Sequence, residues 1–322
     1  MSATTINLPR TNQPIPIVGF GSGTKWQWKK KASEHADSTD PDLVQSIVDA
    51  LETGFKHLDT AEYYTTRPDI GEGLHKYLAK HPEKRREDIF ITDKYAANPP
   101  GVDNNLPDGK IRGPYESAKT CLKLMNIEYL DLFLLHTVDT PQGMTLTQLW
   151  DEMIELQKDG LVKNIGVSNF DVTHLKVLEQ SGVLPQVNQL EFHPYLQEQS
   201  PGVHEYCKER GIIIEAYGPL VPITKAKGQG PLDTLLEDLS KKYNVSESKI
   251  LLKWVHSFGY VTVTTSSKIE RMKDVLSVFD FQLKEEDIVK ISDAGNSFFW
   301  RAFEIPPLPS YDAELKAKRG IV

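Results

Sequence analysis

Short apolar runs alternate with stretches of helical periodicity from one end of the chain to the other. The first long helical stretch starts at Asp40-Pro41, an N-cap followed by a proline at the first helical position. Apolar residues then recur at Leu43 and Ile47, and Gly54 is expected to end this helix. Runs such as Leu132–Leu135 are apolar on both faces, which is typical of strands that are covered by helices.

The same pattern predicts eight strands, most of them separated by helices. The expected strands are Ile15–Phe20, His57–Ala61, Ile89–Thr92, Tyr129–Leu135, Lys163–Val167, Gln186–Phe192, Ile212–Ala216 and Tyr260–Thr264. The helices are expected near residues 41–53, 69–79, 115–125, 146–158, 172–180, 203–210, 232–243, 247–258 and 269–279. Strands separated by helices imply right-handed crossovers and a parallel sheet. Eight such units in about 250 residues predict an α/β fold, a closed (β/α)8 TIM barrel with extra helices and long βα loops. We expect residues 1–322 to form this one domain.

Three polar segments rich in glycine or proline interrupt the pattern. Two are long loops after expected strands, Ala96–Gly113 and Pro219–Pro231, and the third is the tail from Gly295. Because the βα loops of a barrel surround its active-site face, these segments are expected to form the walls of a substrate pocket. At the opposite end of the barrel, Ile6–Pro14 is expected to form a small hairpin that plugs the bottom.

Composition and charge exclude several functional classes. The net charge is −8 and no basic stripe is present to neutralise phosphates, so no nucleic-acid partner is expected. No apolar run approaches membrane-spanning length, and Met1–Arg10 lacks the apolar core of a signal peptide. The nine histidines and two cysteines form no metal-binding motif, so no metal is expected. We predict a cytoplasmic protein with a small-molecule substrate, a monomer or else a homodimer.

Four chemically active residues lie at or just beyond the ends of consecutive expected strands: Asp59, Tyr64, Lys94 and His136. Barrel strands present their carboxyl ends at one face, so these side chains can converge. Free tyrosine has a pKa of about 10, and a neighbouring ammonium lowers it by about 1–3 units. We therefore expect Tyr64 to act as a general acid toward a carbonyl oxygen, with Lys94 lowering its pKa. Asp59 is expected to hold the lysine, and His136 to orient the carbonyl.

Motifs over nearly the whole chain resemble the aldo-keto reductases. They are Asp59–Tyr64, Leu134–His136, Gly166–Phe170 and Gln186–Tyr195. The resemblance implies a (β/α)8 barrel, a catalytic tetrad made of the four residues above, and hydride transfer from a nicotinamide nucleotide. It also implies a cofactor site in which Ser168, Asn169 and Gln189 bind the carboxamide and Tyr217 stacks on the nicotinamide ring. Gly218 and Leu220 would begin the loop under the pyrophosphate.

The expected adenosine end of the cofactor site departs from the family's common pattern. Many relatives carry a Lys-Ser pair after the eighth strand and an Arg and Asn further on, whereas this chain has Thr264–Lys268, then Arg271 and Val275. This variant and the segment Gly21–Trp26 resemble the fungal conjugated polyketone and α-keto amide reductases. The expected NADPH-binding residues here are Thr24, Lys25, Ser266, Ser267, Lys268 and Arg271. Lys268 and Arg271 would hold the 2′-phosphate; the alternative is a solvated helix N-terminus with ordinary basic residues.

Aromatic residues near the expected rim are candidates for the substrate pocket: Trp26, Trp28, Phe299 and Trp300. Alternatively, one or more of them packs the tail onto the barrel. The glycines of Gly19–Gly23 suggest a dinucleotide-binding turn, but Lys25–Ser38 is polar and is expected to be a loop, so the helix which that motif needs is missing. Lys29–Lys31 is expected to be a solvated part of this loop.

These residues and the resemblance together predict an NADPH-dependent carbonyl reductase. The expected substrates are activated ketones (α-keto amides, α-keto lactones and diketones) and aldehydes. Two alternatives stay open: an aldose- or xylose-type sugar reductase, and a regulatory subunit that senses NADPH and turns over weakly. Turnover of an activated ketone, compared with co-purification of a stable partner, would discriminate between enzyme and regulatory subunit.

Overall fold

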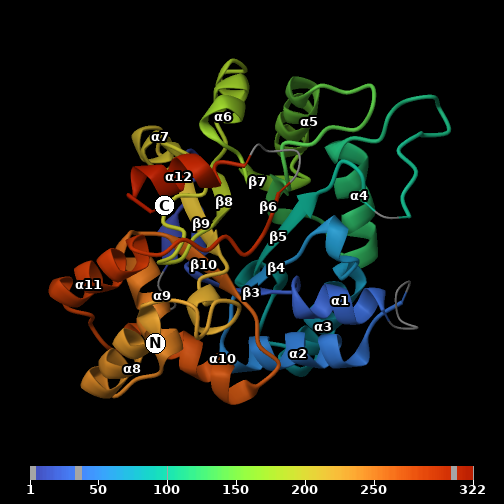
Figure 1. Ribbon diagram of the computed structural model, residues 1–322. Helices are drawn as coiled ribbons and strands as arrows, with labels where there is room; N and C mark the ends of the chain where they lie inside the picture. The colour runs from blue at the N-terminus through green and yellow to red at the C-terminus, as the bar shows by residue number, and fades with distance from the viewer. Residues whose placement is uncertain (1–4, 33–37, 100, 306–309, 322) are drawn as a thin grey trace.

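Eight parallel strands form a closed barrel in the order β10-β3-β4-β5-β6-β7-β8-β9, with helices arranged around it (Figure 1). The computed structural model describes residues 5–32, 38–99, 101–305 and 310–321. The barrel strands are β3 (Val18–Gly21), β4 (His57–Asp59), β5 (Phe90–Tyr95), β6 (Leu130–Leu135), β7 (Val162–Ser168), β8 (Val187–Glu191), β9 (Ile213–Tyr217) and β10 (Val261–Thr264). The predicted (β/α)8 barrel is confirmed.

Most helices lie where the apolar periodicity predicts them. The helices are α1 (Lys25–Lys31), α2 (Pro41–Thr53), α3 (Arg67–Lys80), α4 (Pro114–Met125), α5 (Leu146–Lys158), α6 (Val172–Glu179), α7 (Val203–Glu209), α8 (Leu232–Tyr243), α9 (Glu247–Ser257), α10 (Ile269–Leu276), α11 (Glu285–Asn296) and α12 (Asp312–Lys318). Short 3-10 turns are η1 (Glu62–Tyr64), η2 (Arg86–Asp88), η3 (Val221–Ile223) and η4 (Ser277–Asp280). The Asp40 side chain caps α2 by accepting from two backbone N–H groups, and Gly54 ends it with a φ of 110°.

The N-terminal hairpin closes the bottom of the barrel, as the sequence predicts. β1 (Thr5–Asn7) pairs antiparallel with β2 (Pro14–Pro16). The Gln186 amide, just before β8, donates to the Pro9 carbonyl at 2.8 Å. The prediction of one strand over residues 15–20 is wrong, because the segment divides between β2 of the hairpin and β3 of the barrel.

The prediction of a loop directly after Lys25 is also wrong, because residues 25–31 form helix α1. Trp26 is 3% exposed and Lys30 is 1% exposed, so these two side chains form the buried face of the helix. The Lys30 ammonium pairs with the buried Asp69 carboxylate, which also accepts from the Asp40 backbone N–H at 2.6 Å. Lys30 thus occupies a buried helix position at which an apolar residue would be expected. The prediction that Lys29–Lys31 is a solvated loop is therefore wrong for Lys30. Residues 33–37 of this segment lie outside the described residues.

The register of the barrel strands determines which candidate site residues lie next to each other. Asp59, the last residue of β4, pairs with Thr92 of β5, and Lys94 follows two positions later on the same strand face. On the other side of the barrel Gln189 pairs with Ser168 and Glu215. Across the described ranges, no helix combines the length and apolar character needed to cross a membrane. The same ranges contain no group of three or more His, Cys, Asp or Glu side chains that could hold a metal ion.

Candidate active site

A cavity of about 830 Å³ opens at the carboxyl ends of the barrel strands. Its lining combines strand ends with the loops after β5 and β9 and part of the C-terminal tail. The expected site residues on this lining are Thr24, Lys25, Trp28, Asp59, Tyr64, His136, Ser168, Asn169, Gln189, Tyr217, Gly218 and Leu220. Residues far apart in the sequence therefore share one hollow, in the position where barrel enzymes place their catalytic groups.

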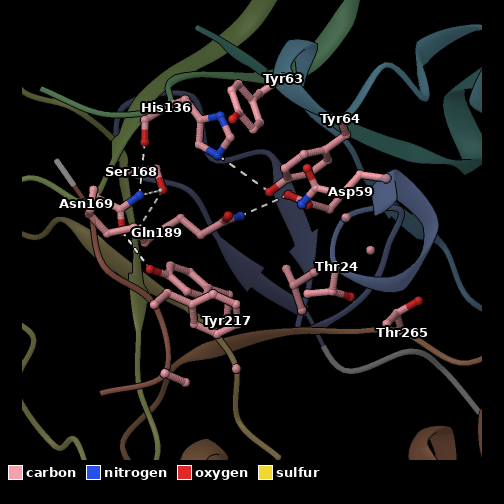
Figure 2. A pocket seen from close by; sticks show the side chains of 18 of the residues that line it. Thr24, Asp59, Tyr63, Tyr64, His136, Ser168, Asn169, Gln189, Tyr217 and Thr265 are labelled. Carbon is pink, nitrogen blue, oxygen red and sulfur yellow. Dashed lines mark hydrogen bonds between the residues drawn. The ribbon is translucent and has the colours of Figure 1, made fainter. Parts of the chain in front are cut away.

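Tyr64 and His136 point toward each other across the cavity (Figure 2), with the tyrosine hydroxyl 3.5 Å from His136 Nε2. Lys94 is fully buried behind them and donates to both carboxylate oxygens of Asp59, at 2.7 and 2.8 Å. Its ammonium also donates to the Thr60 carbonyl at 2.9 Å and lies 5.2 Å from the centre of the Tyr64 ring. The phenol thus has an ammonium beneath it and an imidazole beside it.

Burial dominates the ionisation of the tyrosine. Burial raises the pKa of Tyr64 above its ordinary value, and the positive charge of Lys94 opposes this without reversing it. The expectation that Lys94 brings the pKa of Tyr64 below the free value is therefore not met. The Tyr64 hydroxyl is protonated at neutral pH, as a proton donor must be.

Lys94 is charged, whereas His136 is neutral. Burial alone would lower the pKa of Lys94, but the Asp59 carboxylate outweighs it and the pKa is raised. Burial, then the charge of Lys94, lowers the pKa of His136 to about 3. His136 is consequently a neutral imidazole at physiological pH, which can donate one hydrogen bond without bringing a second charge beside Lys94.

The backbone at Gly23 leaves space for the Tyr64 ring. A Cβ atom at Gly23 would lie 2.9 Å from Tyr64 Cε2, so a side chain larger than glycine would displace the phenol. The next residue, Thr24, has a φ of 45° and a ψ of −111°. This backbone conformation is costly for a β-branched residue, and such strain clusters at functional sites.

A second cluster occupies the other side of the cavity (Figure 2). The Tyr217 hydroxyl donates to Asn169 Oδ1 at 2.8 Å, and the Asn169 amide donates to Ser168 Oγ at 3.1 Å. Ser168 Oγ in turn donates to the Gln189 carbonyl at 2.9 Å. Gln189 Nε2 donates to Asp59 Oδ2 at 2.9 Å, which connects this cluster to the lysine–aspartate pair.

Most residues of the expected adenosine end lie outside the lining of the main cavity. Ser266, Lys268 and Arg271 are not part of the cavity lining, and Lys268 and Arg271 are exposed. Ser267 lines a smaller adjacent hollow together with Lys25, whose ammonium donates to Ser267 Oγ at 2.8 Å. Lys25 lines both hollows and thereby links them.

Only one of the four candidate pocket aromatics lines the main cavity. Trp28 does so and is 64% exposed. Trp26 is buried in α1 beneath Lys25, whose ammonium lies 4.6 Å from its ring centre. Phe299 lies against Lys316 and Arg319 at the end of the tail, whereas Trp300 stacks on Phe298 at 6.3 Å and packs on an apolar cluster that includes Tyr195. Trp26, Phe299 and Trp300 are thus not on the lining of this cavity.

Several lining residues were not predicted from the sequence. Tyr63 lies at the mouth of the cavity, and Phe303 packs edge-on against Tyr217 with ring centres 5.5 Å apart. Thr265 lines the cavity and its buried Oγ1 has no hydrogen-bond partner among the described residues. The neighbouring Tyr63-Tyr64 pair is the one sequence signal that could have indicated Tyr63.

Buried ion pairs fix the loop after β5 to the segment that carries Tyr64. Glu62 accepts from Arg67 Nη1 at 3.0 Å and from the Ala96 backbone N–H at 3.1 Å, and it also pairs with Arg112. Ala96 and Arg112 lie at the two ends of the long loop. Because Glu62 begins η1, the position of the loop is coupled to that of the tyrosine two residues later.

Comparison with known proteins agrees with this geometry. Residues 18–296 match the model of the aldo/keto reductase family, and the chain belongs to that family. It is 40% identical over 291 residues to the NADPH-dependent alpha-keto amide reductase of Saccharomyces cerevisiae, covering 87% of this chain and 88% of that protein. It is 36% identical over 292 residues to the NAD/NADP-dependent indole-3-acetaldehyde reductase of Schizosaccharomyces pombe, covering 90% and 95%.

Two solved structures that resemble this chain are also aldo-keto reductases. A Bombyx mori aldo-keto reductase in complex with NADP superimposes with a TM-score of 0.79 at 27% identity, covering 97% of this chain and 99% of that one. An aldo/keto reductase from Brucella melitensis gives 0.72 at 28% identity, covering 91% and 100%. The family resemblance and the expectation of an oxidoreductase acting on carbonyl groups are thus confirmed.

Proposed function

We propose that this protein is a cytoplasmic, single-domain NADPH-dependent reductase of activated ketones and aldehydes, active as a monomer, with Tyr64 as the proton donor. The observation that supports this best is the Tyr64 hydroxyl 3.5 Å from the neutral His136 and above the buried Lys94–Asp59 pair. Such an arrangement suits the protonation of a carbonyl oxygen placed between the phenol and the imidazole.

The residues of the chain have separate tasks in this reaction. His136 donates a hydrogen bond that orients the carbonyl oxygen toward Tyr64. Tyr64 gives its proton to that oxygen as negative charge develops on it. Lys94 stabilises the phenolate left behind, because its ammonium lies 5.2 Å from the ring centre in a buried environment. Asp59 keeps the ammonium in place and charged.

The cavity is suited to NADPH, which when bound supplies a hydride to the carbonyl carbon. The buried, unpartnered Thr265 Oγ1 on the lining is a polar group that a ligand would satisfy. Ser168, Asn169 and Gln189 would bind the carboxamide, and Tyr217 would present its ring to the nicotinamide. The two named relatives use NADPH or NAD/NADP, and a structural relative was solved with NADP, which supports the same cofactor here.

The 2′-phosphate of NADPH would bind where Lys25 approaches Ser267. Lys25 Nζ lies 2.8 Å from Ser267 Oγ beside the smaller hollow, whose lining also holds Asp49 and Lys29, the latter paired with Asp40 and Asp42. Lys268 and Arg271, the residues expected from the motif, are exposed nearby and would add charge from the start of α10. A basic group from α1 would then compensate for the threonine that stands at position 265.

Aromatic walls favour flat carbonyl substrates over sugars. Trp28, Tyr63 and Phe303 line the cavity, and the Tyr63 ring lies edge-on to His136 with ring centres 6.5 Å apart. The α-keto amide reductase named among the relatives supports α-keto amides as the first substrate class to test, with α-keto lactones and diketones next. The sugar-reductase alternative is less well supported by these walls, and the regulatory alternative by the intact set of four catalytic residues.

A substrate panel tests this proposal. NADPH oxidation would be followed with simple ketones, α-keto amides, diketones, aldehydes and open-chain sugars. We expect the highest kcat/KM with α-keto amides or diketones. A clear preference for open-chain sugars would favour the sugar-reductase alternative, and no turnover with any carbonyl would refute the proposed function.

A further inference from the structure

Glu215 is a buried carboxylate for which the proposed mechanism has no task. It lies on β9 and is 0% exposed. Its Oε2 accepts from Gln189 Nε2 at 2.7 Å, and the same nitrogen donates to Asp59 Oδ2 at 2.9 Å. A single side-chain amide therefore joins Glu215 to the carboxylate that holds Lys94.

The charges in this cluster do not balance if both carboxylates are ionised. Lys94 carries one positive charge, whereas Asp59 and Glu215 would carry two negative charges. The Lys94 ammonium already donates to Asp59 and to the Thr60 carbonyl, which accounts for its hydrogens. An unneutralised carboxylate in a buried site beside a second one is costly, and the usual outcome is that one of them keeps its proton.

The other oxygen of Glu215 has no donor that would stabilise a negative charge on it. Glu215 Oε1 has no hydrogen-bond partner among the described residues and lies 3.7 Å from His57 Nε2. His57 Nδ1 is 3.3 Å from the Pro16 carbonyl, which can only accept, so Nδ1 carries the hydrogen of a neutral ring. His57 Nε2 then accepts from the Thr92 hydroxyl at 2.9 Å, so the ring offers no N–H to Glu215 Oε1. An ionised Oε1 would therefore be buried without a donor, whereas a protonated one carries no charge to stabilise.

We propose that Glu215 is protonated in the working enzyme and acts as a positioning residue for proton donation by Tyr64, through Gln189, Asp59 and Lys94. The inference rests on the proposed function, because it concerns the same proton donor. Burial, followed by the charge of Asp59, raises the pKa of Glu215 to about 8, which agrees with the geometry.

The groups around Glu215 support this assignment. The titratable or charged groups that face it are His57 and Asp59 from β4 and Lys94 from β5, with the neutral Gln189 from β8. Burial lowers the pKa of His57 to about 4, so this ring stays neutral. β10, the other neighbouring strand, has the sequence Val-Thr-Val-Thr and contributes no charge.

The consequence is a pH dependence that Glu215 imposes on the reaction. When Glu215 ionises, its negative charge offsets part of the field of Lys94, and the phenolate that forms on Tyr64 is less well stabilised. We expect kcat for carbonyl reduction to fall about two- to tenfold as pH rises through the titration of Glu215. Glu215→Gln removes this titration and keeps an acceptor for Gln189.

The first test compares pH profiles of kcat from about pH 6 to about pH 10. Wild type is expected to fall above a midpoint near 8, and Glu215→Gln to lack that limb. Asp287→Asn is the matched control, since Asp287 is a fully buried carboxylate on α11, away from the cavity lining. It should keep the wild-type profile. The same alkaline limb in wild type and Glu215→Gln would overturn the proposal.

The second test detects the proton on Glu215 by infrared spectroscopy and does not depend on catalytic activity. In wild type, infrared spectra with isotope-labelled glutamate should contain a carboxylic acid band at neutral pH that disappears with a midpoint near 8. The band should be missing in Glu215→Gln; if that variant does not fold, the wild-type titration still decides. Absence of any protonated glutamate band at neutral pH would overturn the proposal, whereas failure of carbonyl turnover alone would refute the proposed function and leave this result standing.

Discussion

Lys25 Nζ lies 2.8 Å from Ser267 Oγ, which joins the start of α1 to the loop before α10 across 242 positions of sequence. The Lys25 ammonium also lies 4.6 Å from the centre of the Trp26 ring. Trp26 is buried, so it provides a fixed surface beneath the lysine side chain. The two segments that meet here border both the main cavity and the smaller hollow, and we expect this contact to influence the choice of cofactor.

Replacing Lys25 with methionine should weaken the preference for NADPH over NADH. A charged hydrogen bond contributes about 1.5–3 kcal/mol, which corresponds to roughly tenfold to a hundredfold in affinity. The measurement is kcat/KM with both nucleotides in wild type, Lys25→Met and Lys268→Ala/Arg271→Ala. The double variant should show a smaller loss, since these two side chains line neither of the two hollows. An unchanged NADPH:NADH ratio in Lys25→Met would show that Lys25 does not bind the phosphate.

His136→Ala should impair catalysis more than cofactor binding. Its imidazole faces the Tyr64 hydroxyl at 3.5 Å and is neutral, with a pKa lowered to about 3. We expect kcat/KM to fall by about two orders of magnitude or more, with little change in the Kd for NADPH. Steady-state kinetics and a fluorescence titration with NADPH measure the two effects separately. Preserved kcat together with a large loss of NADPH affinity would mean that His136 belongs to the cofactor site.

Lys94→Met should inactivate the enzyme and also destabilise the fold, because it leaves Asp59 buried without its counter-charge. Loss of one partner of a buried pair typically costs about 3–5 kcal/mol. The double variant Lys94→Met/Asp59→Asn removes both charges, so it should regain part of the stability without regaining activity. Urea unfolding and kcat would be measured for both variants. Activity that returns along with stability in the double variant would argue against a catalytic role for the Lys94 charge.

The stability of the protein should depend on pH through Glu215. Its pKa is raised from 4.5 to about 8 in the folded state, so the native protein binds a proton that the unfolded chain releases. The contribution of Glu215 to stability is therefore fully present below the unfolded pKa and is lost as pH rises through the folded pKa, by about 5 kcal/mol in total. The Glu215→Gln variant should not lose this stability, because glutamine does not titrate. The free energy of unfolding of the variant relative to wild type should increase from about pH 5 to about pH 9; an equal difference at both would contradict the prediction.

The barrel was predictable from the sequence because its elements follow simple periods. Helix α5 spans the residues that its apolar repeat indicates, and α2 begins and ends at Asp40 and Gly54 as cap chemistry requires. Helix α1 was not predictable in this way, because Lys30 occupies its buried face. Only the tertiary pairing with Asp69 makes that lysine compatible with burial.

The candidate site was predictable in part. Asp59, Tyr64 and His136 could be associated because each lies at or just beyond the end of a barrel strand. The raised pKa of Tyr64 could not be foreseen, because burial outweighs the nearby ammonium and the extent of burial is a property of the fold. The tail aromatic that reaches Tyr217 is Phe303 and not Phe299 or Trp300, since an irregular segment carries no period from which to assign its faces.

The most direct test of the central claim is the rate of NADPH oxidation with an α-keto amide by wild type and by Tyr64→Phe. The phenylalanine keeps the ring beside Gly23 and removes only the hydroxyl that lies 3.5 Å from His136. The account predicts that kcat falls by about two to four orders of magnitude, while a fluorescence titration finds NADPH bound with nearly unchanged affinity. A folded Tyr64→Phe protein with a kcat near that of wild type would contradict the assignment of Tyr64 as the proton donor.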